Sequence, residues 1–537
     1  MSRHRASNIN STASESPGAG RATPAGDIMV AVQSGHATEL DESFSGRKAS
    51  NAVSWSLGAV VGRQGLQMVC ALVLARILGP SSYGVISAAT IYVTLTTLVL
   101  DQGMASALIQ RKDLAPEAPG AVATFNVLIS VVLAGVTWIV APDLGHFFST
   151  PALESVLRVL GIGLVLKALA ITPRSMLSRS LNFRSIAVAD VGGAACGTIA
   201  GVLSALLGAD YHAVIFQTLI TDLVIAVLLW RASRGPAPNV AVGALREVLP
   251  FGFRVFLTNG VAYFARNTDN ILVGRFLGIT ALSFYSMAYR VLVIPIQMVG
   301  QTVNRVMFPV FAKIAHRRDL LAENLVKSTE MVAMAAVPTM TLLACAAPQL
   351  VTTVLGPFWD PTAPLLSVLA LAGARETIYY ITPALMKATG NASMNLRFEL
   401  VSTAIQVAGI VIGLQFGVFG VAVGYAVSGV VVTPMLLIIQ RRLTGVSISG
   451  QLHALLPSVH PSLWAAAGYF AVSRLPIATW MVLAIGAAVF VVIFAVVLLT
   501  VHRVAARRVG RRIVIMLPSR FSRSRAAVVS AGSRHAR

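Results

Sequence analysis

Residues 477–500 read IATWMVLAIGAAVFVVIFAVVLLT, and no charged side chain interrupts this run. A helix needs about 20 mostly apolar residues to cross the hydrocarbon core of a bilayer, so the run predicts a transmembrane helix. Comparable runs recur along the chain, whose 537 residues are 56% hydrophobic and only 12% charged. A soluble domain carries roughly 25% charged residues. The sequence therefore predicts an all-α integral membrane protein.

The same criterion predicts about fourteen transmembrane helices, arranged as two sets of six and a C-terminal pair. The first set lies near 54–76, 85–108, 121–141, 153–172, 186–208 and 211–230. The second set lies near 251–275, 280–308, 328–347, 362–386, 397–415 and 418–439. The last pair lies near 457–473 and 477–500.

The charges of the connecting loops predict how the chain is oriented. Arginine and lysine gather in loops on the cytoplasmic side of membrane proteins. An even number of helices with both termini in the cytoplasm places almost all loop cations inside, and Arg474 is the clearest exception. The inner loops then carry Arg111, Lys112, Arg174, Arg179, Arg184, Arg231, Arg234, Arg246, Lys313, Arg317, Arg318, Lys327, Lys387, Arg441 and Arg442.

The two ends of the chain differ in composition from its middle. Residues 1–50 are rich in Ser, Ala, Gly and Thr without periodicity, which predicts a disordered cytoplasmic tail. Residues 503–537 form a basic cytoplasmic tail, which is either an anionic-lipid clamp or, the favoured interpretation, a topology anchor. The net charge of +21 is explained by tails and inner loops, so no nucleic-acid partner is expected. Cys70, Cys196 and Cys345 lie far apart, and no metal or cofactor motif is present.

Short segments repeat between the two sets of six helices. Residues 75–80 read ARILGP and residues 274–279 read GRFLGI, at an offset of 199 residues. The triplet ITP recurs at 171–173 and 381–383, at an offset of 210. Matches in corresponding helices predict two six-helix lobes in parallel repeat around a central cavity, which is a transporter design.

The predicted domains follow from this repeat. They are a tail at 1–50, an N-terminal lobe at 51–235, a C-terminal lobe at 236–445, an extra helix pair at 446–502 and a basic tail at 503–537.

Charged side chains at bilayer depth cost about 2.5–3.5 kcal/mol each on insertion scales, so each marks a candidate site. The substrate-binding candidates are these charged residues and Asn270, the amide next to Asp269. They are Arg63, Asp101, Asp222, Arg266, Asp269, Asn270, Arg290, Arg375 and Glu376. Arg266 and Asp269 share a helix face with Asn270, and either line a cavity or form a closed ion pair. Arg63 has no acid nearby in sequence, and we expect it to face a central cavity together with Arg266.

The other candidates have weaker patterns. Arg290 either binds an anion or bonds to carbonyls near Pro295. Arg375 and Glu376 are adjacent, so they point to different faces and are not expected to pair with each other. Asp222 is expected to accept a structural hydrogen bond rather than to bind H+ or Na+. Asp101 lies nearer the inner end of its helix.

Several segments, in order, resemble the polysaccharide-transport branch of the multidrug/oligosaccharidyl-lipid/polysaccharide exporter superfamily. These segments are LARILGP at 74–80, DQG at 101–103, ALIQRKDL at 107–114, SLNFR at 180–184, NTDNILVGRFLG at 267–278, YSMAYR at 285–290 and LGPFW at 355–359. The resemblance covers about residues 50–440. It implies a two-lobed core of twelve helices that works by alternating access, and polyprenyl-diphosphate-linked glycans as substrates.

The predicted function is therefore a flippase in a bacterial inner membrane, working beside membrane lipids, a glycan polymerase and glycosyltransferases. A cation-coupled multidrug antiporter of the same superfamily is the alternative, but a cation exporter needs an acidic cavity and this chain has several deep arginines. An enzyme is disfavoured because the predicted outer loops are too short for a catalytic domain. No cofactor is expected, and coupling to H+ or Na+ stays open.

Overall fold

The structure is a computed structural model that describes residues 25–101, 103–110, 115–235 and 238–508, and every extended element in this part of the chain is a helix. The helices are α1 (Ala25–Asp101), α2 (Met104–Gln110), α3 (Ala118–Phe147), α4 (Ala152–Arg179), α5 (Phe183–Leu206), α6 (His212–Ser233), α7 (Val242–Leu277), α8 (Ile279–Lys313), α9 (Arg318–Val354), η1 (Pro357–Trp359), α10 (Thr362–Tyr379), α11 (Ile381–Ala388), α12 (Ala392–Leu414), α13 (Gly417–Thr444), α14 (Ile448–His453), α15 (Leu456–Ser473) and α16 (Thr479–Thr500).

The first predicted helix, 54–76, and most of the second, 85–108, lie within α1, which is divided by a kink at Gly79, and the end of the second lies on α2. Gly79 has φ 74° and ψ 174°, a conformation that side chains other than glycine rarely adopt. Pro80 follows the kink, where its fixed φ and missing N–H suit the first position of a helix. Gly278 separates α7 from α8 with φ 86° and ψ 169°. The two glycines are 199 residues apart, so the sequence repeat is also a repeat of backbone geometry.

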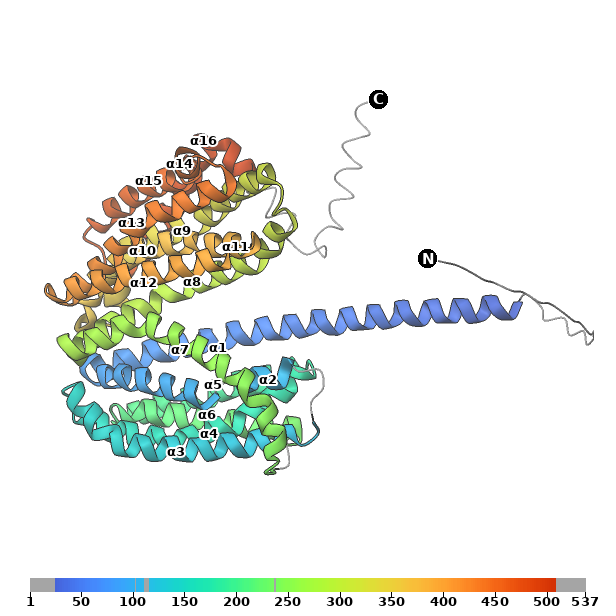
Figure 1. Cartoon of the computed structure of the whole chain (residues 1–537). Coiled ribbons are helices and arrows are strands. Elements are labelled where there is room, and N and C mark those ends of the chain that lie inside the picture. The colour runs from blue at the N-terminus through green and yellow to red at the C-terminus, as the bar shows by residue number, and fades with distance from the viewer. Residues whose placement is uncertain (1–24, 102, 111–114, 236–237, 509–537) are drawn as a thin grey trace, which may run out of the picture.

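The helices form two groups, which Figure 1 shows one above the other. We call α1–α6 the N-lobe and α7–α13 the C-lobe, with α15 and α16 packed against α9. α7 lies between the groups and contacts α1, α2 and α3 as well as α8, α12 and α13. The lobes meet at one end and their ribbons diverge toward the other, where the N-terminal part of α1 extends away (Figure 1).

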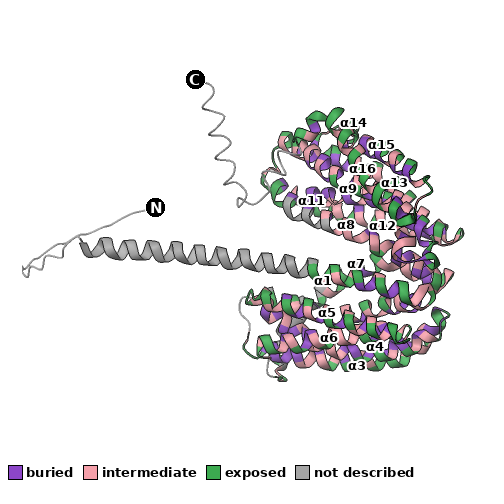
Figure 2. Ribbon diagram, turned by 180° about the vertical axis from the view of Figure 1, so that it is seen from behind, coloured by how far each residue is buried: buried purple, intermediate pink, exposed green. Residues whose placement is uncertain are grey.

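The outer faces of the lobes carry large apolar side chains, as a protein surrounded by lipid requires. Figure 2 shows exposed residues along the whole length of the outer helices. Exposed apolar side chains include Val131, Val132 and Ile139 on α3 and Val491 and Val492 on α16. The predicted class, an all-α membrane protein with a two-lobed transporter fold, is confirmed.

Helix length and composition identify fewer membrane crossings than the fourteen predicted. Ten helices of the described chain are long and apolar enough to cross a membrane. One of the ten spans, Gly62–Ile109, runs across α1 and α2 and overlaps two of the predicted segments, and α7, α10 and α15 are not among the ten. α10 and α15 have only 18 residues each, and α7 carries several charges. All fourteen predicted segments lie on helices, but a count of fourteen crossings stays a prediction.

The predicted boundary between the N-terminal tail and the first lobe, at residue 50, lies inside α1. α1 begins at Ala25, so residues 25–50 are helical and continuous with the first transmembrane segment. No proline occurs between Ala25 and the kink, and a helix that is already nucleated extends more readily than one that starts in isolation. Residues 1–24 and 509–537, with most of the basic tail, lie outside the described residues.

Candidate functional site

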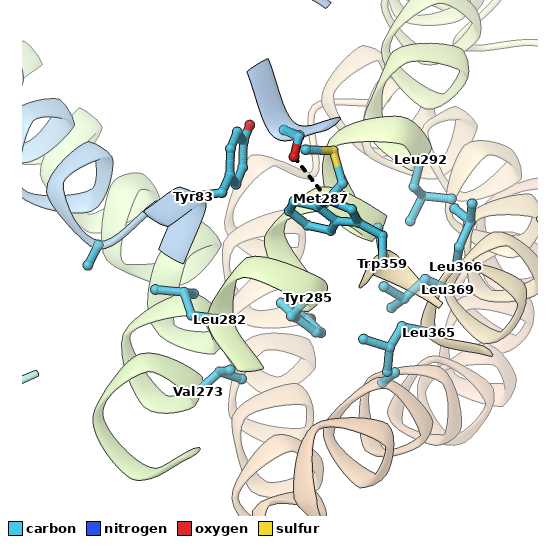
Figure 3. Close-up of a cluster of buried hydrophobic side chains, with 14 of the residues drawn as sticks. Tyr83, Val273, Leu282, Tyr285, Met287, Leu292, Trp359, Leu365, Leu366 and Leu369 are labelled. Carbon is cyan, nitrogen blue, oxygen red and sulfur yellow. Dashed lines mark hydrogen bonds between the residues drawn. The ribbon is translucent and has the colours of Figure 1, made fainter. Parts of the chain in front are cut away.

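The two lobes contact each other closely at the end that contains Gly79 and Gly278. Trp359 is fully buried there, and its Nε1 donates a hydrogen bond to the carbonyl oxygen of Ala75 at 3.0 Å (Figure 3). Tyr83 packs edge-on against Trp359 with ring centroids 5.5 Å apart. These contacts join α1 to the loop after α9 and close this end of the space between the lobes.

Arg76 adds a polar contact at the same closed end. Its Nη1 donates hydrogen bonds to the carbonyl oxygens of Thr353 and Val354, at 2.7 and 3.0 Å. Both acceptors lie in the last turn of α9, where helix carbonyls lack partners and carry partial negative charge. Deeper between the lobes, the hydroxyls of Ser87 and Ser286 lie 2.9 Å apart. These two serines are also 199 residues apart, so the hydrogen bond joins repeat-related positions of α1 and α8.

A cavity of about 570 Å³ lies between the lobes, and Ser87 and Ser286 are part of its lining. We call it the central cavity. α1, α4 and α6 of the N-lobe line it together with α7 and α8 of the C-lobe. Side-chain amides are a prominent part of its wall, and these are Gln64, Gln67, Gln217, Asn267, Asn270 and Gln297. Each amide both donates and accepts hydrogen bonds, so the wall suits a polar, hydroxyl-rich ligand.

Among the described residues that line the central cavity, the charged ones are two cations and one carboxylate. Lys167 Nζ lies 3.0 Å from Asp222 Oδ2. Arg290 is exposed in the cavity, with its Cζ 6.0 Å from the centroid of the Tyr83 ring, and it forms no ion pair within the described chain. Lys167 Nζ also donates a hydrogen bond to Asp222 Oδ1 at 3.3 Å, so Arg290 is left as the unneutralised charge among the described lining residues.

Lys167 is a lining residue that the sequence analysis missed. It stands inside the predicted helix at 153–172 in the apolar context GLVLKALAI, so a lysine at bilayer depth was the available signal. The glutamines of the wall carry no such signal, because an uncharged amide in an apolar helix does not reveal which face it occupies.

Arg63 has a carboxylate partner from another helix. Its Nη1 lies 3.6 Å from Asp190 Oδ2, and Arg174 also binds Asp190, with Nη1 donating to Oδ2 at 3.0 Å. Two arginines thus share one carboxylate on α5. Arg63 does not line the central cavity, although Gln64 next to it does. Asp190 was also overlooked in the sequence.

Asp269 is buried but is not paired with Arg266. Its carboxylate accepts hydrogen bonds from the Tyr285 hydroxyl at 3.0 Å and from the backbone N–H of Asn270 at 2.8 Å. Arg266 is exposed and forms no ion pair with any residue that the structure describes. The closed pair, one of the two alternatives, is therefore absent, because Tyr285 on α8 supplies the partner instead. Of these residues, Asn270 lines the central cavity.

Arg375 and Glu376 have separate partners, as expected for adjacent residues that point in different directions from their helix. Arg375 Nε donates to Thr433 Oγ1 at 3.2 Å, and Glu376 Oε2 accepts from the Tyr425 hydroxyl at 2.8 Å. Both partners lie on α13, so these charges join α10 to α13 inside the C-lobe. Neither residue lines the central cavity.

A second cavity of about 540 Å³ lies within the N-lobe, between α1, α4 and α6, and we call it the N-lobe side pocket. Asp101 lines it, together with Thr97 and the apolar side chain of Leu160. Thr94 and Lys167 line both this pocket and the central cavity, so the two spaces adjoin.

The sequence of the chain is similar to those of several bacterial biosynthesis proteins. The chain is 24% identical to the lipopolysaccharide biosynthesis protein WzxC of Escherichia coli (strain K12), over 70% of this chain and 78% of that protein. It is 26% identical to the teichuronic acid biosynthesis protein TuaB of Bacillus subtilis (strain 168), over 55% and 62% of the two chains. It is 28% identical to the succinoglycan biosynthesis transport protein ExoT of Rhizobium meliloti (strain 1021), over 60% and 65%.

Solved structures share the fold. The chain resembles the lipid II flippase MurJ in an inward closed conformation with a TM-score of 0.68 and 15% identity, over 84% of this chain and 99% of that one. It also resembles an inward-facing multidrug resistance MATE family transporter with a TM-score of 0.59 and 15% identity, over 73% and 98%. The family described as polysaccharide biosynthesis protein matches residues 73–364, which is more than half of the chain. This matched range includes the contact between the lobes and most of the lining of both cavities. The chain belongs to this polysaccharide biosynthesis protein family.

Proposed function

We propose that the chain moves a polyprenyl-diphosphate-linked glycan from the cytoplasmic to the outer face of a bacterial inner membrane by alternating access. The family and the relatives named for lipopolysaccharide, teichuronic acid and succinoglycan biosynthesis support a role in surface polysaccharide synthesis. The two-lobed fold, closed at one end, supports transport through the space between the lobes.

The observation that carries the proposal is the charge of the central cavity. Lys167 and Arg290 outnumber Asp222, and Arg290 has no carboxylate partner within the described chain. A cation in a cavity between transmembrane helices is stabilised when an anion binds it, and a diphosphate supplies that anion. The amide wall can then bind sugar hydroxyls. A drug antiporter for organic cations is disfavoured by the same charges.

The membrane potential favours this direction of transport. A diphosphate diester carries about two negative charges, and an inside-negative potential drives each outward by about 2.3 kcal/mol per 100 mV. The direction requires the closed end of the lobes to face outward and both termini to be cytoplasmic, as the loop charges predict. The proposal needs no cofactor, and coupling to H+ or Na+ is an alternative driving force.

In this proposal the chain is not an enzyme, because the glycan crosses without any covalent bond changing. Glycosyltransferases supply the lipid-linked glycan on the inner face, and a polymerase consumes it on the outer face. Membrane lipids surround the apolar outer helices and hold the prenyl chain during transfer.

Arg290→Gln tests the proposal, because it removes the unpaired charge without leaving a buried carboxylate unpartnered. A charge-assisted hydrogen bond is worth about 1.5–3 kcal/mol, so we expect transport to fall by roughly 10- to 100-fold. Lipid-linked glycan should accumulate on the cytoplasmic face while protein abundance stays normal. Arg290→Lys should be partly active, since an ammonium cannot supply the paired donors of a guanidinium.

Arg275→Gln is the matched control. Arg275 also lies over an aromatic ring, with its Cζ 5.3 Å from the Phe147 centroid, but it lines neither cavity. Its variant should transport normally. Wild-type transport by Arg290→Gln at normal abundance would contradict the anionic-cavity mechanism and make drug efflux the leading function.

A further inference from the structure

Three threonines of α1 form a row along the N-lobe side pocket. Thr90, Thr94 and Thr97 follow one another at helical spacings and all line the pocket. Each hydroxyl donates its proton to a carbonyl oxygen of its own helix four residues earlier, at 2.8, 2.7 and 2.6 Å respectively. A hydroxyl whose proton is used in this way still accepts hydrogen bonds through its remaining lone pairs. The row therefore presents acceptors to the pocket.

Other lining groups have the same character. Thr218 on α6 faces the pocket and donates to the carbonyl of Val214 at 2.8 Å, so it too is left as an acceptor. Asp101 stands at the end of the threonine row, and its Oδ1 is buried without a hydrogen-bond partner in the part of the chain that the structure describes. A buried acceptor without a partner is costly, so a ligand that donates hydrogen bonds would be stabilised here.

The pocket adjoins the central cavity at Lys167. Thr90, Thr94 and Lys167 line both spaces. A ligand whose diphosphate contacts Lys167 and Arg290 would therefore have the pocket beside its next chemical group. Apolar side chains such as Val156 and Leu160 complete the pocket wall, and these suit the C–H faces of a sugar ring. The volume of about 540 Å³ lies within the usual range of small-molecule sites.

We propose that the N-lobe side pocket binds the sugar next to the diphosphate, with sugar hydroxyls donating to the threonine row and to Asp101. This inference rests on the proposed function and adds to it a second binding element with a different chemistry. The central cavity binds the diphosphate through charge, and the pocket binds the attached sugar by accepting hydrogen bonds from the sugar hydroxyls. The chain should therefore distinguish a glycosylated from a sugar-free polyprenyl diphosphate.

The test compares the affinity of two probes for the purified full-length protein: undecaprenyl diphosphate, and the same lipid carrying a single glucose. We expect the wild-type protein to bind the glucosylated lipid at least about tenfold more tightly. Thr97→Val keeps the shape of the side chain but removes the acceptor, and it should reduce this preference by about fivefold. Asp101→Asn should reduce it by about tenfold, because the charged acceptor is lost. Thr97→Ser keeps the hydroxyl and should retain the preference.

Thr339→Val is the control, because Thr339 is exposed on α9, makes the same bond to the carbonyl four residues earlier at 2.8 Å and lines neither cavity. The Thr339→Val protein should prefer the glucosylated lipid to the same degree as the wild-type protein. An unchanged preference in both Thr97→Val and Asp101→Asn would overturn the sugar pocket while leaving the flippase proposal standing. Failure of the wild-type protein to bind either lipid would instead overturn the proposed function, and the sugar pocket with it.

Discussion

The contact of Arg76 with the end of α9 should hold the lobes closed, and its removal should open them. The guanidinium donates from α1 to the carbonyls of Thr353 and Val354, which belong to the other lobe. Arg76→Ala removes both hydrogen bonds and the favourable interaction with the helix terminus. The apolar contact around Trp359 is untouched, so we expect a shift between conformations rather than loss of the fold.

The size of the shift follows from the two bonds. A hydrogen bond from a charged donor is worth about 1.5–3 kcal/mol when protected, but Arg76 is exposed and water competes for both partners. A total of about 1–2 kcal/mol is therefore reasonable. This free energy changes the ratio of open to closed protein by roughly 5- to 30-fold.

Labelling of a cysteine in the central cavity measures this ratio. Ser286→Cys places a thiol in the cavity lining, in a protein whose three native cysteines, Cys70, Cys196 and Cys345, are replaced by serine. A membrane-impermeant maleimide added from outside intact cells reaches this thiol when the lobes separate at their closed end. Arg76→Ala should raise the labelling rate by the same 5- to 30-fold.

The control is Arg474→Ala, which removes an arginine from a loop predicted on the same face. Arg474 has no ion pair among the described residues, so its variant should label at the parent rate. Equal labelling of the Arg76→Ala and parent proteins would refute the idea that Arg76 holds the lobes together.

Two further predictions concern packing and topology. Gly84→Ala would place a Cβ 2.3 Å from the carbonyl oxygen of Ile279, so we expect the protein to lose about 1–3 kcal/mol of stability. The melting temperature of the purified protein should fall accordingly. Gly135→Ala is the control and should be neutral, because a Cβ at this position would have no atom within 4 Å. Reporter fusions after Arg234 should be active in the cytoplasm and fusions near Asp210 on the outer side, and the reverse result would mean that the predicted orientation is wrong.

Much of the fold could be predicted because lipid imposes a simple rule on the sequence. Long apolar runs must be helices in a bilayer, and each predicted run lies on a helix. The offset of 199 residues was also visible, and the paired conformations of Gly79 and Gly278 give it a structural meaning. The helical start of α1 at Ala25 was missed, because a polar, small-residue segment does not reveal that it continues a transmembrane helix.

The candidate site was harder to predict, because ion pairs between helices depend on tertiary packing. The spacing of Arg266 and Asp269 made a local pair plausible, but Tyr285 from the next helix is the partner of Asp269. Arg63 was known to need a partner, yet nothing local indicated Asp190 on α5. Charge at bilayer depth locates candidate residues, whereas their partners and the faces they occupy come from the packing of helices.

The two lobes share the backbone positions of the sequence repeat, but they differ in the side chains that line the cavities. Offset by 199 residues, Gly79 corresponds to Gly278 and Ser87 to Ser286, and these positions shape the contact between the lobes. At the same offset Arg290 corresponds to Ile91, so the cation that is unpaired among the described lining residues has no counterpart at this position of the N-lobe.

The N-lobe contributes the threonine row and Asp101, whereas in the C-lobe the carboxylates Asp269 and Glu376 are bound by tyrosines within the lobe. A ligand that spans the two lobes would thus meet the unpaired Arg290 on the C-lobe side and the threonine row on the N-lobe side. Rocking of the lobes changes the distance between these two elements, because one lies in each lobe. Only a ligand with an anionic group next to a donor-rich group contacts both, and a lipid-linked glycan has this arrangement at the bond between its diphosphate and its first sugar.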